Sequence, residues 1–166
     1  CGRERTAMSA VAREPRARML LSALIALVLQ VLPLPWALSV IRPAFLVVVV
    51  LYWSIAAPRA GGLTFGWFAG LVLDMFQGVV LGQHALAVAL VTYLAIRFHL
   101  QIRNRPILDQ SLIAFVALAL YEFVVWAIDG WTGHPVASAL RWLPPVAGGL
   151  IWPVVALLLG RGQSFR

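Results

Sequence analysis

The sequence predicts an all-α integral membrane protein with about six transmembrane helices. Of its 166 residues, 62% are hydrophobic and only 11% are charged, and the mean hydropathy is +0.91. A soluble domain is about 25% charged, and a chain of this length folded in water would leave too much of this apolar surface exposed. The composition therefore requires the lipid bilayer as the solvent of the protein.

Apolar runs separated by short polar segments supply the predicted helices. The run from Ala60 to Ile96 would be about 55 Å long as one helix, nearly two crossings of the ~30 Å hydrocarbon layer. We therefore divide it at GVVLGQH into two helices joined by a tight turn. The segment from Arg97 to Arg105 is expected to be a polar loop. The prediction comprises a basic tail at 1–18, spans at 19–38, 43–57, 63–78, 82–96, 107–128 and 143–159, and a short tail at 161–166.

The positive charge predicts the orientation of the chain. The net charge of +7 comes entirely from arginine, because the sequence has no lysine. With both termini in the cytoplasm, eleven arginines lie inside and only Arg42 and Arg141 lie outside, as the positive-inside rule requires. Arg97, Arg103 and Arg105 are the predicted topology-setting residues of the central loop. Nucleic acid is not an expected partner, because the arginines lie in short segments between apolar runs.

A stripe of small residues marks the predicted third span. Gly66, Gly70, Asp74 and Gly78 recur every four residues, so they share one face of a helix. Stripes of small residues allow two membrane helices to approach closely. The pattern therefore predicts a helix-packing stripe, in which Asp74 points toward a neighbouring helix or a cavity and away from lipid.

Four polar residues form a predicted intramembrane cluster. A carboxylate at the bilayer centre costs ~2.5 to 3.5 kcal/mol on insertion scales, so Asp74 should be protonated or paired. Counting from the inner ends of the helices places Asp74 and Glu122 at similar depth in the outer half of the membrane, with Gln77 and His84 near that level. Two interpretations stay open: interhelical hydrogen bonds that only fix packing, or a site for a ligand, a proton or a partner.

Signatures of catalytic and metal sites are absent from the sequence. It contains no GxSxG, HExxH, CxxC or GxxxxGK[ST] motif, and its single cysteine, Cys1, excludes an internal disulfide and a multi-cysteine metal site. We therefore expect no enzymatic activity, no cofactor and no metal. Asp74 and Glu122 as an acid pair for hydrolysis within the membrane is the remaining catalytic alternative, and it requires water access.

The block GLVLDMFQGVVLGQHALAVALVTYLA, from Gly70 to Ala95, resembles the family of the bacterial rod shape-determining protein MreD. The basic segment RFHLQIRNRPILDQ, the motif LYEF and the end WLPPVAGGLIWPVVALLL extend the resemblance over roughly Thr64 to Gly160. The resemblance implies a multi-pass protein of the bacterial inner membrane without known catalysis. It also implies a bitopic partner, MreC, within the cell-elongation machinery for lateral peptidoglycan synthesis, and indirect partnership with MreB, RodA and the transpeptidase partner of RodA.

The same family is similar in architecture to the substrate-binding membrane subunits of energy-coupling-factor vitamin transporters. Two functional hypotheses follow. The leading one is a non-enzymatic membrane scaffold that binds MreC and helps to organise lateral peptidoglycan synthesis. The alternative is a small-molecule-binding subunit of a transporter, with Asp74, His84 and Glu122 lining a pocket open to the outside.

Overall fold

The computed structural model describes residues 2–33, 35, 41–133 and 139–160, with the backbone alone for residues 2–15. Within these residues the chain is entirely helical and contains no strand, which confirms the predicted all-α class. The end of the predicted first span, residues 36–38, and the predicted tail at 161–166 lie outside the described residues. The helices are α1 (Gly2–Val31), α3 (Phe45–Ala56), α4 (Leu63–Gln77), α5 (Gln83–Arg103), α6 (Ile107–Trp131), the short 3-10 helix η1 (Ala139–Trp142) and α7 (Leu143–Gly160).

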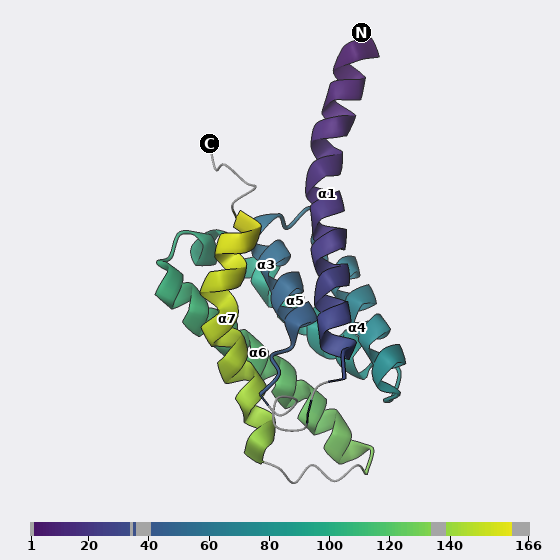
Figure 1. Ribbon diagram of the computed structural model, residues 1–166, viewed down its shortest axis with the longest axis vertical. Helices are drawn as coiled ribbons and strands as arrows, with labels where there is room; N and C mark the ends of the chain where they lie inside the picture. Colours follow the sequence, from purple (N-terminus) through teal and green to yellow (C-terminus); the bar gives the residue numbers. More distant parts are fainter. Residues whose placement is uncertain (1, 34, 36–40, 134–138, 161–166) are drawn as a thin grey trace.

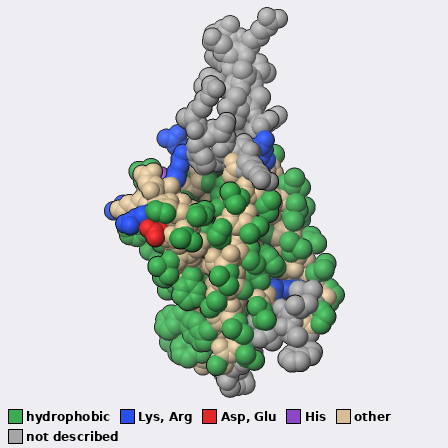
Figure 2. Space-filling view, turned by 60° about the vertical axis from the view of Figure 1, so that its left-hand side comes forward, with side chains coloured by type: hydrophobic (Ala, Val, Ile, Leu, Met, Phe, Trp, Pro, Cys, Tyr) green, Lys and Arg blue, Asp and Glu red, His purple; other side chains and the backbone are tan. Residues whose placement is uncertain are grey.

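The helices form a bundle in which α1 lies along one side and continues beyond it (Figure 1). The N-terminal end of α1 and the C-terminal end of α7 lie at the same end of the molecule (Figure 1). The turn between α5 and α6 is also there, because Arg103 and Asn104 line one hollow together with Gly160. We call this the arginine-rich end, and Figure 2 shows basic side chains gathered there above a largely apolar body. The opposite end, with the turn between α4 and α5, is the hairpin end.

Three helical segments are long and apolar enough to cross a membrane, judged by length and composition over the described residues. They are α5, α6 and the continuous segment Ala139–Gly160 formed by η1 and α7. α3 and α4 are apolar but shorter, about 18 Å and 22 Å at 1.5 Å per residue. The chain therefore has the helices of a membrane protein, with two short helices packed among longer ones.

α3 is the core of the bundle. All ten residues from Leu46 to Ile55 are buried, and α1, α4, α5, α6 and α7 all contact this helix. A helix that is apolar on every side is stable where other elements cover all of it, and the sequence FLVVVVLYW has this character. Because its neighbours surround it, α3 does not need the length of a lipid-exposed span.

Polar side chains hold α1 against α3 in an antiparallel arrangement. Near the C-terminal end of α3, the Trp53 Nε1–H donates to Ser22 Oγ at 2.9 Å. Near its N-terminal end, the Leu46 N–H donates to Gln30 Oε1 at 3.1 Å. The second bond satisfies a backbone donor in the first turn of α3, which has no partner within its own helix. Two contacts far apart along α1 thereby fix its register on the core.

One segment predicted as a loop is helical in the structure, and most of the basic tail is helical as well. α1 begins at Gly2, so the basic segment 1–18 continues the first apolar helix from its second residue onward. α5 runs to Arg103, so the expected loop from Arg97 to Arg105 is wrong over most of its length. For α5 the physical reason lies in the residues themselves. A membrane boundary changes which side chains are favourable but does not break a helix, and arginine is a good helix former, so α5 continues until Asn104 and Pro106.

Glycines bring α4 and α5 into close contact. A Cβ atom added at Gly70 would lie 2.4 Å from Ala85 Cα, and one at Gly66 would lie 2.4 Å from Thr92 Oγ1. Both distances are shorter than any ordinary van der Waals contact, and the first is to backbone, which cannot rotate away. α4 therefore packs directly on the backbone of α5, as small residues at a membrane helix interface permit.

We predict that Gly70→Ala lowers the free energy of unfolding by about 1–3 kcal/mol, because the added methyl group must push α4 away from α5. Thermal melting of the purified chain in detergent measures the change. Gly130→Ala is the matched control, since Gly130 lies in α6 with no atom within 4 Å of its added Cβ, and alanine there should be neutral or stabilising by up to about 1 kcal/mol. Equal melting temperatures for the two variants would contradict the close contact.

Candidate functional site

Asp74 lies at the hairpin end and caps the first turn of α5. Its Oδ2 atom accepts hydrogen bonds from the backbone N–H groups of Gly82 at 2.8 Å and Ala85 at 3.3 Å. Its Oδ1 atom accepts from the backbone N–H of His84 at 2.8 Å and from His84 Nδ1 at 2.9 Å. The side chain of one helix thus caps the next helix of the hairpin.

The cap completes the hydrogen bonding of the start of α5. A helix leaves its first N–H groups without intrahelical partners, and the residue at the N-cap of α5 is Gly82, which has no side chain to supply one. The Gln83 N–H donates to Val80 O at 3.1 Å, and the Leu86 N–H donates to Gly82 O at 2.8 Å. Together with the bonds to Asp74, every N–H from Gly82 to Leu86 is paired.

The Asp74 carboxylate has no hydrogen-bonding capacity left. A carboxylate has about four lone-pair sites on its two oxygens, and the four contacts from Gly82, His84 and Ala85 occupy them. The residue is 1% exposed, and its negative charge faces the positive end of the α5 dipole. In this state the carboxylate is suited to hold two helices together, and it offers no free oxygen to a ligand.

His84 extends the capped turn toward α6. The residue is 5% exposed, and its ring packs against the ring of Tyr121 with 5.9 Å between centroids. Because the carboxylate of Asp74 is an acceptor, the Nδ1 atom of His84 is the donor in their contact. His84 therefore contributes to both the α4–α5 hairpin and the packing of α5 on α6.

A second polar network lies at the same end and is centred on Arg141 of η1. The guanidinium contacts Glu122 Oε2 at 3.3 Å and Asp129 Oδ2 at 2.6 Å. These two acids are seven residues apart on α6, so they lie on one face, two turns apart. The Gln83 Nε2 atom donates to Asp129 Oδ1 at 2.5 Å. This network ties η1 and α6 to the first residue of α5.

The structure places the four residues of the predicted polar cluster in different surroundings. Asp74 and His84 are in direct contact. Glu122 contacts Arg141 instead, and Gln77 is exposed near the end of α4. The two networks meet at the start of α5, where Gln83 joins one and His84 joins the other.

Sequence reasoning did not assign the cap or the role of Arg141. A signal for the cap was present, because GQH follows Asp74 by eight residues and a helix that begins at glycine needs an acceptor from elsewhere. The spacing of Glu122 and Asp129 also indicated one helix face. Their partner was hidden because η1 follows a loop, and loop length does not reveal which helix face the next element will meet.

The four residues of the predicted packing stripe have different structural roles. Gly66 and Gly70 contact α5, and Asp74 caps it. Gly78 instead ends α4 in the left-handed conformation, with φ of 64°, and no atom lies within 4 Å of a Cβ built there. Glycine is favoured at this position because it adopts positive φ without a steric cost.

The predicted topology-setting arginines all belong to the arginine-rich end. Arg97 and Arg103 lie on the last two turns of α5, and Arg105 lies in the turn that follows. Arg105 forms an exposed ion pair with Asp109 at 3.8 Å. By contrast, Arg42 at the hairpin end donates to the backbone carbonyl groups of Gln30 and Leu32, and thereby caps the end of α1.

A metal site in a protein is built from His, Cys, Asp or Glu side chains. Within the described ranges, no group of three or more of these side chains lies close enough together to form one. The acids at the hairpin end are held by backbone N–H groups, by Gln83 and by Arg141. The acids at this end are therefore engaged by donors of the protein itself.

Comparison with known proteins gives a consistent result. The family model described as rod shape-determining protein MreD matches residues 15–161, a range that includes α3 to α7 and most of the apolar part of α1. The chain is also similar to the rod shape-determining protein MreD of Haemophilus influenzae (strain ATCC 51907 / DSM 11121 / KW20 / Rd). The identity is 31% over 138 residues, which cover 81% of this chain and 83% of that protein. No solved structure matches.

We predict that Asp74→Asn lowers the free energy of unfolding by about 1–3 kcal/mol. An amide group replaces one acceptor oxygen and leaves buried N–H groups unpaired. Hydrogen exchange should quicken at the amides of Gly82 and Ala85, which report the cap directly. Asp109→Asn is the control, since its side chain is 50% exposed and such surface changes stay within about 0.5 kcal/mol. Unchanged exchange at both amides in Asp74→Asn would refute the cap.

Proposed function

The chain belongs to the family of the rod shape-determining protein MreD, and from this premise we propose that it is a non-enzymatic scaffold of the cell-elongation machinery. The resemblance indicated by the block from Gly70 to Ala95 is confirmed by the family match and by the curated relative. Family membership gives the chain a role in determining rod shape. The finer proposal is that it binds an MreC-type bitopic protein and helps to organise lateral peptidoglycan synthesis, with MreB, RodA and the transpeptidase partner of RodA as indirect partners.

The observation that carries the proposal is the extent of the family match. It covers residues 15–161 and so includes α3, the α4–α5 hairpin, α6 and α7 as one unit. A match limited to one helix pair would support only a shared packing motif. Because the match covers the whole described bundle from Pro15 onward, the function is proposed for the bundle as a unit.

The state of the buried polar groups supports a scaffold. Asp74 is saturated by the start of α5, and Arg141 is neutralised by Glu122 and Asp129. General acid–base catalysis needs a group that can reach a substrate and exchange a proton with it. Groups that are fully engaged with one another rigidify a bundle, and a rigid bundle is what a partner helix needs as a docking surface.

The same contacts count against the alternative, a small-molecule-binding subunit of a transporter. In that hypothesis Asp74, His84 and Glu122 line one pocket and face a ligand. The carboxylates of Asp74 and Glu122 instead have separate partners, and the side chain of Asp74 is fully buried. A ligand at Asp74 would have to displace backbone N–H groups of α5, at the cost of leaving them unpaired within the membrane.

We propose the bacterial inner membrane as the location, with several membrane crossings and both termini in the cytoplasm. Arg97, Arg103 and Arg105 lie together at one end of the bundle, where basic charge faces the cytoplasm in membrane proteins. At the hairpin end, Arg141 is neutralised by two acids, and Arg42 is engaged by carbonyl groups. The positive charge of the chain is therefore concentrated at the arginine-rich end.

The proposed orientation predicts which end a membrane-impermeant thiol reagent reaches. In a Cys1→Ser background, a cysteine at Trp131, which is 94% exposed at the hairpin end, should be labelled in cells with a permeabilised outer membrane. A cysteine at Gln101, exposed on α5 near the arginine-rich end, should be labelled only after the inner membrane is disrupted. The reverse pattern would require the opposite orientation.

Depletion of the protein in its rod-shaped native host tests the scaffold itself. We expect cells to widen and round, new wall material to become dispersed along the side wall, and the MreC-type protein to leave its normal positions. Fluorescent labelling of new peptidoglycan and of the MreC-type protein measures these changes. Complementation with wild type should restore the rods, and Gly70→Leu should fail because it separates α4 from α5.

The controls separate loss of the scaffold from other causes. Gly130→Leu should restore rods, since Gly130 has open space around it, and the membrane level of each variant is measured in parallel. Failed uptake of a vitamin-like solute with unchanged cell width would favour the transporter. Normal recovery of the MreC-type protein with Gly70→Leu, at wild-type membrane level, would show that the hairpin does not support the partner surface.

A further inference from the structure

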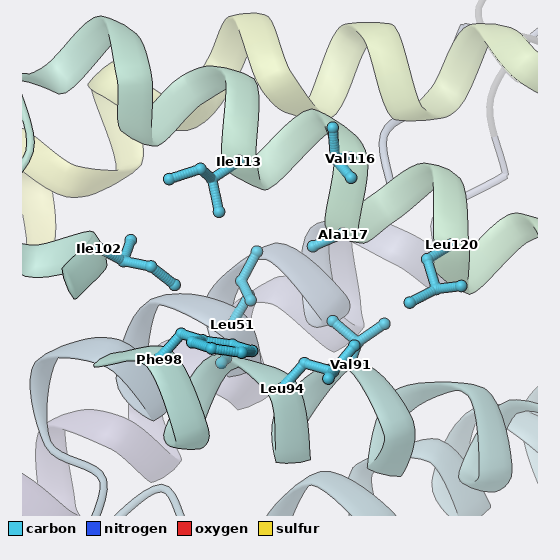
Figure 3. Close-up of a pocket in the computed structure, with 10 residues that line it drawn as sticks. Leu51, Val91, Leu94, Phe98, Ile102, Ile113, Val116, Ala117 and Leu120 are labelled. Carbon is cyan, nitrogen blue, oxygen red and sulfur yellow. The ribbon is translucent and has the colours of Figure 1, made fainter. Parts of the chain in front are cut away.

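An apolar groove runs between α5 and α6 on the outside of the bundle. It has a volume of about 210 Å³ and is lined only by hydrophobic residues, with Leu51 of α3 at its floor. Side chains of α5 and α6 face each other across it, with Phe98 near one end and Leu120 near the other (Figure 3). Val116 on its rim is 57% exposed. Because both helices have the length and composition of membrane spans, the groove opens to lipid.

The groove continues into a polar hollow at the arginine-rich end. This second hollow, of about 520 Å³, shares Phe98, Ile102 and Ile113 with the groove, so the two lie next to each other, and we call them together the channel. Its polar members are Gln101, Arg105 and Asp109. The channel therefore changes from purely apolar to charged where α5 ends and α6 begins.

The length of the whole channel, hollow and groove together, is close to the thickness of one leaflet of a bilayer. Asp109 and Leu120 lie at its two ends on α6, and eleven residues of helix rise about 16 Å. Half of a ~30 Å hydrocarbon layer is about 15 Å. A chain that begins at the charged hollow and follows the groove would end near the middle of the membrane.

The charges in the hollow have both signs. Arg105 and Asp109 lie 3.8 Å apart, and their side chains are 64% and 50% exposed. Both are therefore accessible to a further group. Arg103 lines the separate hollow beside Gly160. A headgroup with phosphate alone would meet the carboxylate of Asp109, whereas one with a phosphate and an ammonium group would match both partners.

We propose that this channel binds a phospholipid with a phosphate and a primary ammonium in its headgroup, such as phosphatidylethanolamine. One acyl chain lies in the groove between α5 and α6. The phosphate accepts from Arg105 and from the side-chain amide of Gln101, and the ammonium donates to Asp109. The binding energy comes from acyl contacts along the groove, and the headgroup contacts provide the selectivity. This inference is independent of the proposed scaffold function.

Native mass spectrometry of the full chain in detergent tests the site. The protein is mixed with equal amounts of phosphatidylethanolamine, phosphatidylcholine and phosphatidylglycerol with identical acyl chains. We expect the one-to-one adduct with phosphatidylethanolamine to exceed the adduct with phosphatidylglycerol by about two- to fivefold. This is the range of affinity that one surface ion pair supports. Asp109→Asn should bring this ratio close to one. Arg105→Gln should weaken all three adducts, and Arg59→Gln, an exposed arginine at the same end, should weaken none.

A matched pair of variants tests the groove. Val116→Phe adds a ring at the groove rim and should reduce all three adducts, whereas Val154→Phe adds the same ring on α7, where Val154 is 54% exposed, and should reduce none. Melting temperatures close to wild type for both variants show that each is folded. A photo-crosslinker at Leu112, which lines the hollow, should capture phospholipid in cells.

Several results would overturn the proposal. Glycerol adducts that equal or exceed ethanolamine adducts in the wild-type chain would exclude recognition of the ammonium. A preference for phosphatidylethanolamine that survives Asp109→Asn, or adduct levels that Val116→Phe leaves unchanged, would place the lipid elsewhere. Capture of a protein instead of a lipid at Leu112 would identify the groove as the seat of a partner helix.

Discussion

The backbone N–H groups at the start of α5 are the constraint on which the rest of the structure depends. In a membrane each unpaired N–H costs several kcal/mol, because no water is available to replace the missing partner. α5 begins at a glycine, which has no side chain to cap it, and Asp74 of the preceding helix supplies the acceptor. This explains the position of an aspartate within GLVLDMF. The carboxylate is tolerated because the turn of the next helix surrounds it with donors.

The cap fixes the positions of other elements through the geometry of the hairpin. Asp74 can reach the start of α5 only if α4 lies close to α5, and Gly70 allows this approach because it has no side chain against Ala85. Once α5 is in place, Gln83 at its first position meets Asp129 of α6, and Asp129 in turn holds Arg141. A chain of polar contacts therefore runs from α4 to η1. Hydrophobicity alone would not select these neighbours, because lipid is as apolar as the helix surfaces.

Composition and spacing were sufficient to predict the helical class and the family, since the requirement for a lipid solvent acts on every residue and the block from Gly70 to Ala95 is distinctive. They were insufficient for the end of α5, which continues past the arginines because no residue before Asn104 and Pro106 breaks the helix, and for the start of α1, which is helical from Gly2 and across Pro15. The partner of Glu122 also could not be predicted. Depth along a helix places a residue in one dimension only, and the choice between Asp74 and Arg141 depends on the rotation of α6 and on the path of the loop before η1. Tertiary packing sets both.

The two ends of the bundle differ in how they use charge, and this difference separates structural from interacting surfaces. At the hairpin end, Asp74 is saturated and Arg141 is paired with both Glu122 and Asp129, so these contacts stabilise the fold itself. At the arginine-rich end, the side chains of Arg105 and Asp109 are at least half exposed and are 3.8 Å apart, and such a pair contributes only about 0.2–1 kcal/mol. Charges that add so little to folding remain available to headgroups or to partners. The end with the stronger internal contacts therefore defines the shape of the bundle, and the end with the weaker contacts is where binding at the membrane surface is expected.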